Sequence, residues 1–274
     1  MTKLSDLATE QSNSRSAKLD RLSIPQLLRV INREDATVAL AVGRAIPRIA
    51  DATKIIAQKL KAGGRLFYIG AGTSGRLGCL DASEMPPTYG VSHTLIQGII
   101  AGGPPALTRS QEGAEDDAKA GVRDIRTRKI SKRDAVIGLS VSGRARYVRE
   151  ALNEARRRGA FTACITCNKN SLLIPCAEVA MVVETGPEVV AGSTRMKAGT
   201  AQKMILNMIS TASMVQLGRV KGNRMLDLQI KCEKLEERAV NLIVEETGAT
   251  AAKALKALKQ AKGSVRTAIN LLQP

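Results

Sequence analysis

The sequence contains no tryptophan, and aromatic side chains make up only 2% of its 274 residues. Because 44% of the residues are hydrophobic, an ordinary share for a globular protein, the core must be built from Ile, Leu, Val, Ala and Met. The scarcity of aromatics excludes a base-stacking platform for single-stranded nucleic acid. No apolar run reaches the length of a membrane-spanning helix, so we do not expect a membrane protein.

Histidine is nearly absent, and cysteine occurs in an odd number. The chain has one histidine, His93, and five cysteines. Cys164 and Cys167 form a C-x-x-C inside an apolar stretch typical of a strand. Residues three apart on a strand face opposite sides, which disfavours a shared zinc ion. The odd count and the lack of a signal-peptide pattern predict free thiols in a reducing compartment, so we expect a cytoplasmic protein.

Acidic residues are outnumbered by basic ones, 25 against 42, which gives a net charge of +17. Such a charge attracts polyanions, although a general basic bias of the chain explains it equally well. The cations are scattered over predicted helical segments without interleaved aromatics, so we do not expect nucleic acid as a partner. They include Arg123, Arg126, Arg128, Lys129, Lys132, Arg133 and the run 156–158.

Hydrophobic periodicity divides the chain into helical ends and a middle in which strands and helices alternate. A polar arm (1 to about 20) precedes helical periodicity over 25–61, and the chain is helical again after about 220. We predict strands at 66–69, 94–100, 135–139, 162–166 and 179–183, and helices at about 75–83, 105–120, 145–158 and 198–217. This alternation predicts an α/β fold with a doubly wound parallel sheet. We expect an N-terminal arm with helices (1–55), a central domain (56–220) and a small C-terminal helical piece (221–274).

The most informative segment follows the first predicted strand and has the sequence Gly70-Ala-Gly-Thr-Ser-Gly75. Its glycine spacing matches a dinucleotide-binding fingerprint, but the next strand ends in Ala101-Gly-Gly-Pro-Pro105, without an acid to hold a ribose. Thr73 and Ser74 instead suit a phosphomonoester. A second hydroxyl-rich loop, Ser140-Val-Ser-Gly143, follows another strand. Because ligands bind at the carboxyl ends of parallel strands, the two loops predict two halves of one sugar phosphate site.

Two acidic segments could supply acid–base chemistry beside that phosphate. Glu84 follows the first loop by about two helical turns, and we expect Pro86-Pro87 to make the chain extended directly after it. The cluster Glu112-Gly-Ala-Glu-Asp-Asp117 is dense for so basic a chain. A solvated helix face remains an alternative for both segments. Two carboxylates near one phosphate would provide an acid and a base with separated pKa values.

A third segment rich in glycine and hydroxyls extends from Gly186 to Lys203. Ser193 and Thr194 precede a predicted helix start, and Arg195 and Lys197 add positive charge. The pattern is compatible with a capped helix that carries ordinary surface cations. The density of glycine and hydroxyls favours a loop that closes over an anionic sugar.

Together these segments resemble the N-acetylmuramic acid 6-phosphate etherase family, which has the sugar isomerase (SIS) fold. The resemblance covers about residues 5–270 and is carried by Thr9-Glu-Gln-Ser-Asn13, Tyr68–Gly78, Leu80–Gly90, Glu112–Asp116, Gly192–Lys203, Leu206–Thr211 and Gly222-Asn223. The chain departs from the family pattern at Met85, where cysteine is usual, and at Ala145-Arg146, where Thr-Pro is usual.

The resemblance implies a carbon–oxygen lyase of cell-wall sugar recycling. Its substrate would be N-acetylmuramic acid 6-phosphate, whose D-lactyl ether is cleaved by elimination and water addition to give N-acetylglucosamine 6-phosphate and D-lactate. It implies Glu84 as the proton donor and Glu115 as the second acid/base residue. It also implies a homodimer with sites near the subunit interface and without metal, nucleotide or other cofactor. The implied phosphate ligands are Thr73, Ser74, Ser140 and Ser142, and the further substrate-loop residues are Gly72, Ser193, Thr194, Arg195 and Lys197.

Two other classes of protein remain compatible with the sequence. A sugar phosphate sensor on the same fold, similar to glucokinase regulatory protein, would keep the phosphate loops but would not need both carboxylates. A nucleic-acid-binding regulator with a sugar phosphate domain would agree with the charge, but residues 1–50 show no helix-turn-helix pattern. The presence of both carboxylates favours the enzyme.

Overall fold

A five-stranded parallel sheet forms the centre of the protein, as predicted. The computed structural model describes residues 7–226 and 233–273. The strand order is β2-β1-β3-β4-β5, so the chain reverses its direction of winding between β1 and β3. The strands are β1 (Leu66–Gly70), β2 (Ile96–Ile100), β3 (Ala135–Leu139), β4 (Phe161–Thr166) and β5 (Val179–Val182).

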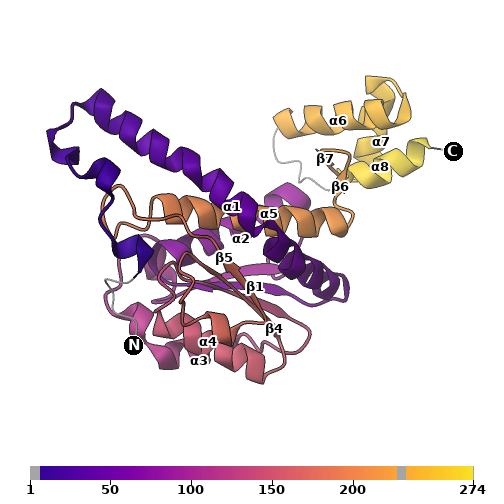
Figure 1. The fold of residues 1–274 in the computed structure, drawn as a ribbon. Coiled ribbons are helices and arrows are strands. Elements are labelled where there is room, and N and C mark those ends of the chain that lie inside the picture. Colours follow the sequence, from indigo (N-terminus) through magenta and orange to yellow (C-terminus); the bar gives the residue numbers. More distant parts are fainter. Residues whose placement is uncertain (1–6, 227–232, 274) are drawn as a thin grey trace.

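Helices cover both faces of this sheet, which makes it doubly wound (Figure 1). One face packs against α1 (Ile24–Lys61), α2 (Gly72–Tyr89) and α5 (Lys197–Gln216), and the other against α3 (Ala118–Thr127) and α4 (Arg146–Arg157). The strands β1, β3 and β4 are buried along their whole length. The two cores are aliphatic apart from a few Phe and Tyr side chains, as the composition required.

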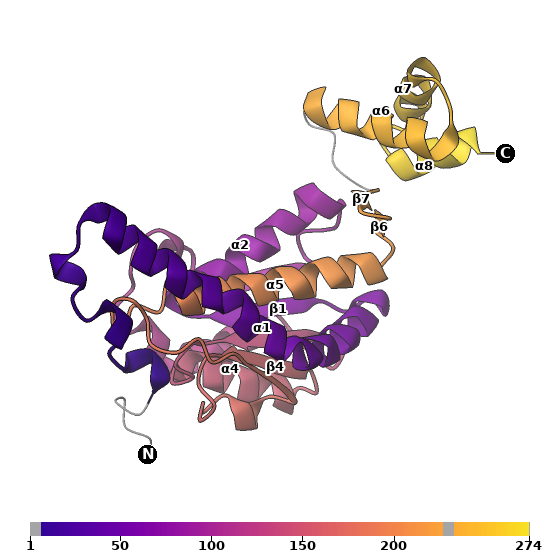
Figure 2. The same cartoon turned by 45° about the horizontal axis from the view of Figure 1, so that its top comes forward.

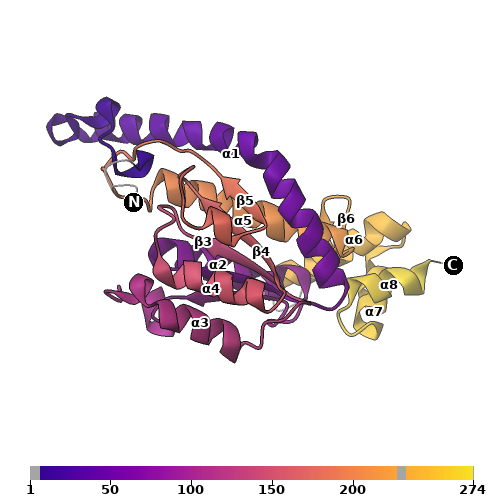
Figure 3. The ribbon, with the colours of Figure 1, turned by 60° about the horizontal axis from the view of Figure 1, so that its bottom comes forward.

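Helix α1 is a single element that includes all of the predicted periodic stretch. Ser23 and Gln26 form a capping box at its start, where Pro25 occupies the first turn. Pro47 lies inside the helix, and Figure 3 shows α1 bending along its course, as expected where a proline removes a backbone donor. The predicted domain limit between residues 55 and 56 falls inside this helix, and the division into three domains stays a prediction.

Two predicted helical segments differ from the observed ones. Helix α2 continues to Tyr89 with Pro86 and Pro87 inside its last turn, so Glu84 does not lie at a break in structure. The predicted helix at 105–120 is instead two short 3₁₀ turns, Pro104–Leu107 and Ala114–Asp116, followed by α3. Gly113 has a positive φ of 71°, and the Asp117 side chain accepts from the Ala120 N–H and so begins α3 later than predicted.

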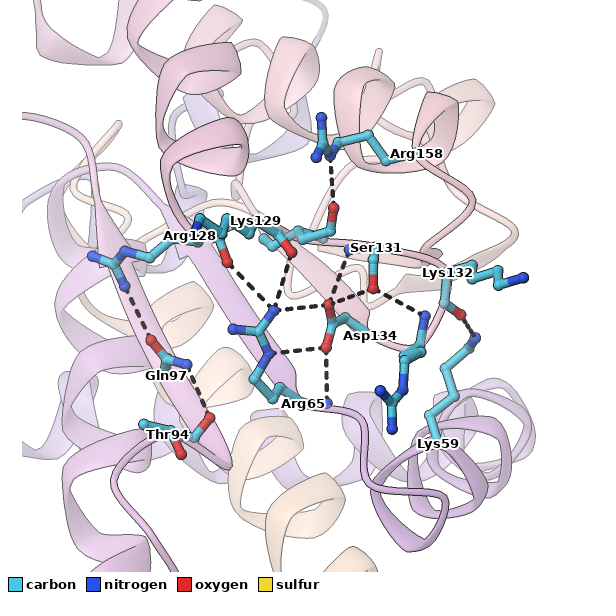
Figure 4. A network of polar contacts seen from close by, with 12 residues as sticks. Lys59, Arg65, Thr94, Gln97, Arg128, Lys129, Ser131, Lys132, Asp134 and Arg158 are labelled. Atoms are coloured by element: carbon cyan, nitrogen blue, oxygen red, sulfur yellow. Dashed lines mark hydrogen bonds and ion pairs between the residues drawn. The ribbon is translucent and has the colours of Figure 1, made fainter.

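An ion pair fastens the amino ends of β1 and β3 (Figure 4). Asp134 is 2% exposed, and its carboxylate accepts from the backbone N–H of Arg65 at 3.1 Å and from its guanidinium at 3.0 Å. The backbone N–H of Ser131 donates to the same carboxylate at 2.9 Å. Lys59 at the end of α1 donates to the carbonyl of Lys132 at 2.7 Å. These contacts fix the two strands whose opposite ends carry the hydroxyl-rich loops.

The C-terminal part forms its own small helical unit, as predicted (Figure 2). It contains a hairpin of β6 (Val220–Lys221) and β7 (Arg224–Met225), followed by α6 (Glu233–Thr247), α7 (Ala251–Gln260) and α8 (Val265–Leu272). The helices share a hydrophobic core that is separate from the sheet. Among the helices of the described residues, none is both long and apolar enough to cross a membrane.

Candidate active site

A cleft of about 720 Å³ lies at the carboxyl ends of β1 and β3. These strands are neighbours in the sheet, and the chain leaves them in opposite directions, β1 toward β2 and β3 toward β4. A parallel sheet opens a crevice at such a reversal because the connecting helices diverge to opposite faces. The cleft is lined by both hydroxyl-rich loops, so the structure brings together the two segments that the sequence predicted as half-sites.

The first half-site is the beginning of helix α2 rather than a free loop. Gly72, with φ of 53°, starts the helix, and the first-turn backbone N–H groups of Gly72, Thr73 and Ser74 have no partner within the helix. Gly75 must be glycine, because a Cβ there would lie 2.6 Å from the Ile100 side chain. The fingerprint-like spacing therefore reflects tight packing of α2 on the sheet, and the free N–H groups of a helix start are suited to bind an anion.

The hydroxyl of Ser74 already forms a hydrogen bond within the described chain. It is buried and donates to Oε1 of Gln202 on α5 at 2.8 Å, while Nε2 of Gln202 has no partner there. Both side chains are almost fully enclosed, with Ser74 7% exposed and Gln202 fully buried. Helix α5 is thus hydrogen-bonded directly to the first turn of α2.

The second half-site follows β3 and is shaped by Gly143. Ser140 is buried, and its hydroxyl accepts from the Gly143 N–H at 3.1 Å, which folds the loop into a tight turn. Gly143 has φ of 73°, and a Cβ on it would lie 1.8 Å from the hydroxyl of Ser171. Ser142 is half-buried and accepts from the Arg144 N–H at 3.3 Å. Helix α4 starts directly after this turn, so a second helix N-terminus lies close to the cleft.

The cleft carries both cations and carboxylates. Arg144, Arg146 and Arg149 line it, which provides positive charge for an anionic ligand. Glu115 and Asp116 line it from the 3₁₀ turn that precedes α3. Of these five residues, the sequence singles out only Glu115 and Arg146 by position. The others belong to charged runs that are indistinguishable from solvated surface until the fold brings them to one wall.

A further carboxylate comes from the N-terminal arm. Glu10 lines the cleft from the 3₁₀ turn Ala8–Glu10, although sequence reasoning attached no function to it. Thr9 beside it is fully buried and accepts from the Asn168 amide at 3.4 Å. The arm is therefore anchored over the described part of its length, and it forms one wall of the cleft.

Glu84 does not line this cleft. It lies twelve residues after Gly72 on the continuous helix α2, so about 18 Å of helix axis separate it from the start of α2. Its exposed side chain lines a separate pocket of about 200 Å³, together with Leu80, Asp81 and Lys203. Within one chain, the two predicted acid/base residues therefore lie at different places.

Of the glycine-rich segment before α5, Thr194 reaches the cleft. Ser193 is half-buried and Arg195 is exposed, and neither is among the residues that line it. The start of α5 is capped by neither hydroxyl. Instead the buried Glu188 carboxylate accepts from the N–H groups of Lys197 and Ala198 at 3.0 and 2.9 Å.

Lys197 points into the protein rather than toward the cleft. Its side chain is 1% exposed, and its ammonium lies 2.7 Å from the Glu34 carboxylate of α1, which is 3% exposed. Asn13 of the N-terminal arm also donates to Glu34, at 2.9 Å, and to the Pro187 carbonyl at 3.3 Å. Burial tends to raise the pKa of Glu34, but the hydrogen bonds from Lys197 and Asn13 and the Lys197 charge together hold it below its ordinary value. This network ties the arm, α1 and the loop before α5 together.

The cysteines take no part in the cleft. Cys164 and Cys167 are buried free thiols, and burial raises the pKa of each to about 12, so both are protonated and unreactive at neutral pH. Cys232 lies outside the described residues. Across 7–226 and 233–273, no three His, Cys, Asp or Glu side chains lie together as a bound metal ion would require.

Comparison with known proteins agrees with this fold. The family described as "Glucokinase regulatory protein N-terminal SIS domain" matches residues 48–156, and the SIS domain family matches residues 120–212. The solved structure of a phosphoheptose isomerase from Francisella tularensis has a TM-score of 0.53 with 14% identity, and the match covers 71% of this chain and 100% of that one. That likeness shows the fold.

Sequence relatives are much closer. A protein of Symbiobacterium thermophilum named N-acetylmuramic acid 6-phosphate etherase is 52% identical over 97% of this chain and 88% of its own length. A protein of the same name from Geobacillus thermodenitrificans is 49% identical over 98% of this chain and 91% of its own length. With such identity over nearly the whole length of both partners, the chain belongs to the N-acetylmuramic acid 6-phosphate etherase family.

Proposed function

We propose that this protein cleaves the D-lactyl ether of N-acetylmuramic acid 6-phosphate, giving N-acetylglucosamine 6-phosphate and D-lactate, in the cytoplasm and as part of cell-wall sugar recycling. The observation that carries the proposal is the cleft at the strand reversal, where an anion-binding helix start, three arginines and the Glu115 carboxylate meet in a member of this family. The substrate carries two anionic groups, its phosphate and its lactyl carboxylate, and the cleft supplies cations for both. This chemistry needs no nucleic acid as a partner.

The 6-phosphate binds at the helix start of α2 and the turn after β3. Thr73, Ser74, Ser140 and Ser142 surround it, and Gly72 allows the backbone to approach closely. The hydroxyl proton of Ser74 is directed to Gln202 in the described chain. Turning the Gln202 amide by 180° would make its unpartnered Nε2 the donor and free the Ser74 proton for the phosphate.

The loop before α5 completes the substrate site in this proposal. Thr194 contacts the substrate, while Ser193 and Arg195 lie at the rim. Lys197 supports the loop from inside through its ion pair with Glu34. Thr194 therefore acts on the substrate directly, whereas Lys197 acts indirectly, by holding the loop in position.

The reaction itself is an elimination followed by addition of water. Opening the sugar ring gives an aldehyde at C1, which makes the C2 proton acidic. Glu115 removes that proton, Glu84 protonates the C3 ether oxygen as lactate leaves, and water then adds to the unsaturated sugar. An ether oxygen is a poor leaving group unless it is protonated, so the reaction depends on both carboxylates.

The two carboxylates meet across a homodimer. Glu84 and Glu115 do not line a common cavity in one chain, since about 18 Å of helix separates Glu84 from the turn beside Glu115. In a dimer, Glu84 of one protomer completes the cleft of its partner. This requires that the surface around Glu84 be an interface between the copies.

That surface has the composition of an interface. The side chains of Ile46, Leu80, Met208 and Val215, from α1, α2 and α5, are 51%, 54%, 36% and 45% exposed. A mostly apolar groove of about 790 Å³ lies between α1 and α5, and Met208 lines it next in sequence to Asn207 of the Glu84 pocket. Exposed apolar residues gathered on adjoining helices mark an interaction site, and a second copy of this chain is the occupant that also completes the active site.

Subunit mixing tests the activity and the shared site together. Glu84→Gln and Glu115→Gln are each expected to release little lactate from the substrate. If they are denatured and refolded as a one-to-one mixture, half of the dimers are mixed, and one of the two sites in each mixed dimer is intact. The mixture should therefore recover about a quarter of the parent turnover.

The controls separate the possible failures. Glu112→Gln, at a neighbouring exposed carboxylate that accepts from the Ser110 hydroxyl, should keep the parent turnover. A parent protein that releases no lactate would refute the activity. Recovery of no more than the sum of the separate variants would show that both carboxylates act from one chain and would refute the shared site.

A further inference from the structure

The proposed reaction contains a step to which neither Glu84 nor Glu115 is assigned. Before the C2 proton becomes acidic, the pyranose must open to an aldehyde, which requires proton transfer at O1 and O5. Histidine suits such a step at neutral pH, but the one histidine, His93, lies exposed in the turn before β2, at the opposite end of the strands from the cleft. Another group of the cleft must do this work.

The cleft offers few groups that can transfer a proton. Its three arginines remain protonated in proteins and cannot act as bases. The carboxylates that line it are Glu10, Glu115 and Asp116. Glu115 and Asp116 are neighbours on one turn before α3, whereas Glu10 comes from the N-terminal arm. Among these three carboxylates, Glu10 is therefore the one that does not share a turn with Glu115, the proposed C2 base.

The structure holds Glu10 firmly but leaves its carboxylate without a partner among the described residues. Leu7 and Thr9 in the same turn are at most 3% exposed, and Asn13 is bound to Glu34 and Pro187. Within 7–226 and 233–273, no hydrogen bond or ion pair is formed by the Glu10 side chain. A carboxylate on an anchored backbone, in a cleft lined with arginines, is available to accept a proton from a bound ligand.

Contact with the substrate loop adds a second observation. Oε2 of Glu10 lies 3.2 Å from the position that a Cβ on Gly192 would occupy. Gly192 belongs to the same loop as Thr194, which also lines the cleft. The Glu10 carboxylate therefore lies against the loop that reaches the sugar, and it belongs to neither of the two turns that bind the phosphate.

We propose that Glu10 is a third catalytic residue, which opens the sugar ring, a role that rests on the proposed function of this cleft. Glu10 accepts the proton of the C1 hydroxyl, and the O1–H electron pair becomes the second bond of the C1 carbonyl. The C1–O5 bond breaks, its electron pair moves to O5, and O5 takes a proton from water. Glu10 returns its proton to the resulting hydroxide, so no proton is gained or lost.

Interconversion of the α and β anomers of N-acetylglucosamine 6-phosphate tests this role by itself. The interconversion requires ring opening but neither C2 deprotonation nor an ether to cleave. Exchange NMR on the sugar labelled with ¹³C at C1 should show acceleration by the parent protein and a loss of at least about 10-fold in Glu10→Gln. Glu10→Asp, which keeps the carboxylate, should recover part of the rate.

The control and the rival residue are both available in this chain. Asp20→Asn removes the same charge from an exposed position of the same arm and should leave the exchange rate unchanged. Unchanged acceleration in Glu10→Gln, its loss in Asp116→Asn instead, or no acceleration by the parent protein would each overturn the proposal. Failure of the etherase activity would appear separately, as missing lactate release from the muramic acid phosphate.

Discussion

The ammonium of Lys197 and the carboxylate of Glu34 form an ion pair of 2.7 Å in which neither side chain is more than 3% exposed. The pair joins the start of α5 to the first third of α1, and the Asn13 amide of the N-terminal arm donates to the same carboxylate. One buried charge pair thus holds together three segments that are distant in sequence, and two of them, the arm and the loop before α5, line the cleft.

Removing one partner of this ion pair should lower the stability of the protein. Lys197→Met leaves the Glu34 carboxylate buried without its main counter-charge, so we expect a loss of about 3–5 kcal/mol in the free energy of unfolding. Denaturant unfolding followed by circular dichroism measures it. Arg15→Met is the matched control, because Arg15 pairs with Glu34 from a side chain that is 66% exposed and should contribute about 1 kcal/mol or less. Equal losses in the two variants would contradict this view of the buried pair.

Acid should destabilise the fold through carboxylates whose pKa is lowered in the native state. Burial raises the pKa of Asp134, but hydrogen bonds from Arg65 and the Ser131 backbone, with the Arg65 charge, hold it below its ordinary value. The pKa of Glu34 is lowered in the same way. Because the unfolded chain binds protons more readily, their contribution is complete above about pH 5 and is lost as the pH falls through the lower native pKa.

We therefore expect the contribution of these two carboxylates to the denaturant midpoint to be constant from neutral pH to about pH 5 and to fall below it. Asp134→Asn should be less stable than the parent at pH 7, and its midpoint should fall less steeply in acid. The same slope in both proteins between about pH 5 and pH 2 would show that Asp134 does not contribute to the acid sensitivity.

The two serines of the phosphate site should respond differently to substitution. Ser142→Ala removes a half-buried hydroxyl at the cleft and should weaken binding of 6-phosphosugars by about 1.5–3 kcal/mol with little effect on stability. Ser74→Ala should weaken binding similarly and also lower stability by about 1–3 kcal/mol, since it leaves the buried Gln202 oxygen without its donor. Calorimetric titration with N-acetylglucosamine 6-phosphate and thermal unfolding separate these effects. Parent-like affinity in both variants would place the phosphate elsewhere.

Hydrogen exchange at C2 should distinguish the base from the acid. The base acts before lactate leaves, so in deuterated water Glu84→Gln should still exchange deuterium into C2 of the substrate while it releases lactate at least about 100-fold more slowly. Glu115→Gln should lose both exchange and release. Mass spectrometry of the recovered sugar gives the result. Exchange in Glu115→Gln but not in Glu84→Gln would reverse the two roles.

The sequence predicted that the two hydroxyl-rich loops lie together because their signals are local. A strand followed by glycine and hydroxyls marks a turn at the carboxyl edge of a sheet, and the alternation of elements predicts that both turns lie on the same edge. The location of Glu84 in the fold could not be predicted from a local signal of this kind. Pro86-Pro87 suggested a break, but α2 continues through both prolines to Tyr89, and the left-handed conformation of Gly90 ends it.

Composition and periodicity by themselves determined the aliphatic core and the doubly wound sheet, and the resemblance of the sequence motifs to a known family indicated the family. Each of these properties depends on residues that are neighbours in the sequence or on the average character of many residues. Only the tertiary structure decided that Lys197 is buried against Glu34, that Glu10 lines the cleft and that Glu84 does not. Those facts depend on which distant segments pack together, and a charged residue has the same local sequence pattern whether it lies in a cleft, in solvent or in a buried pair.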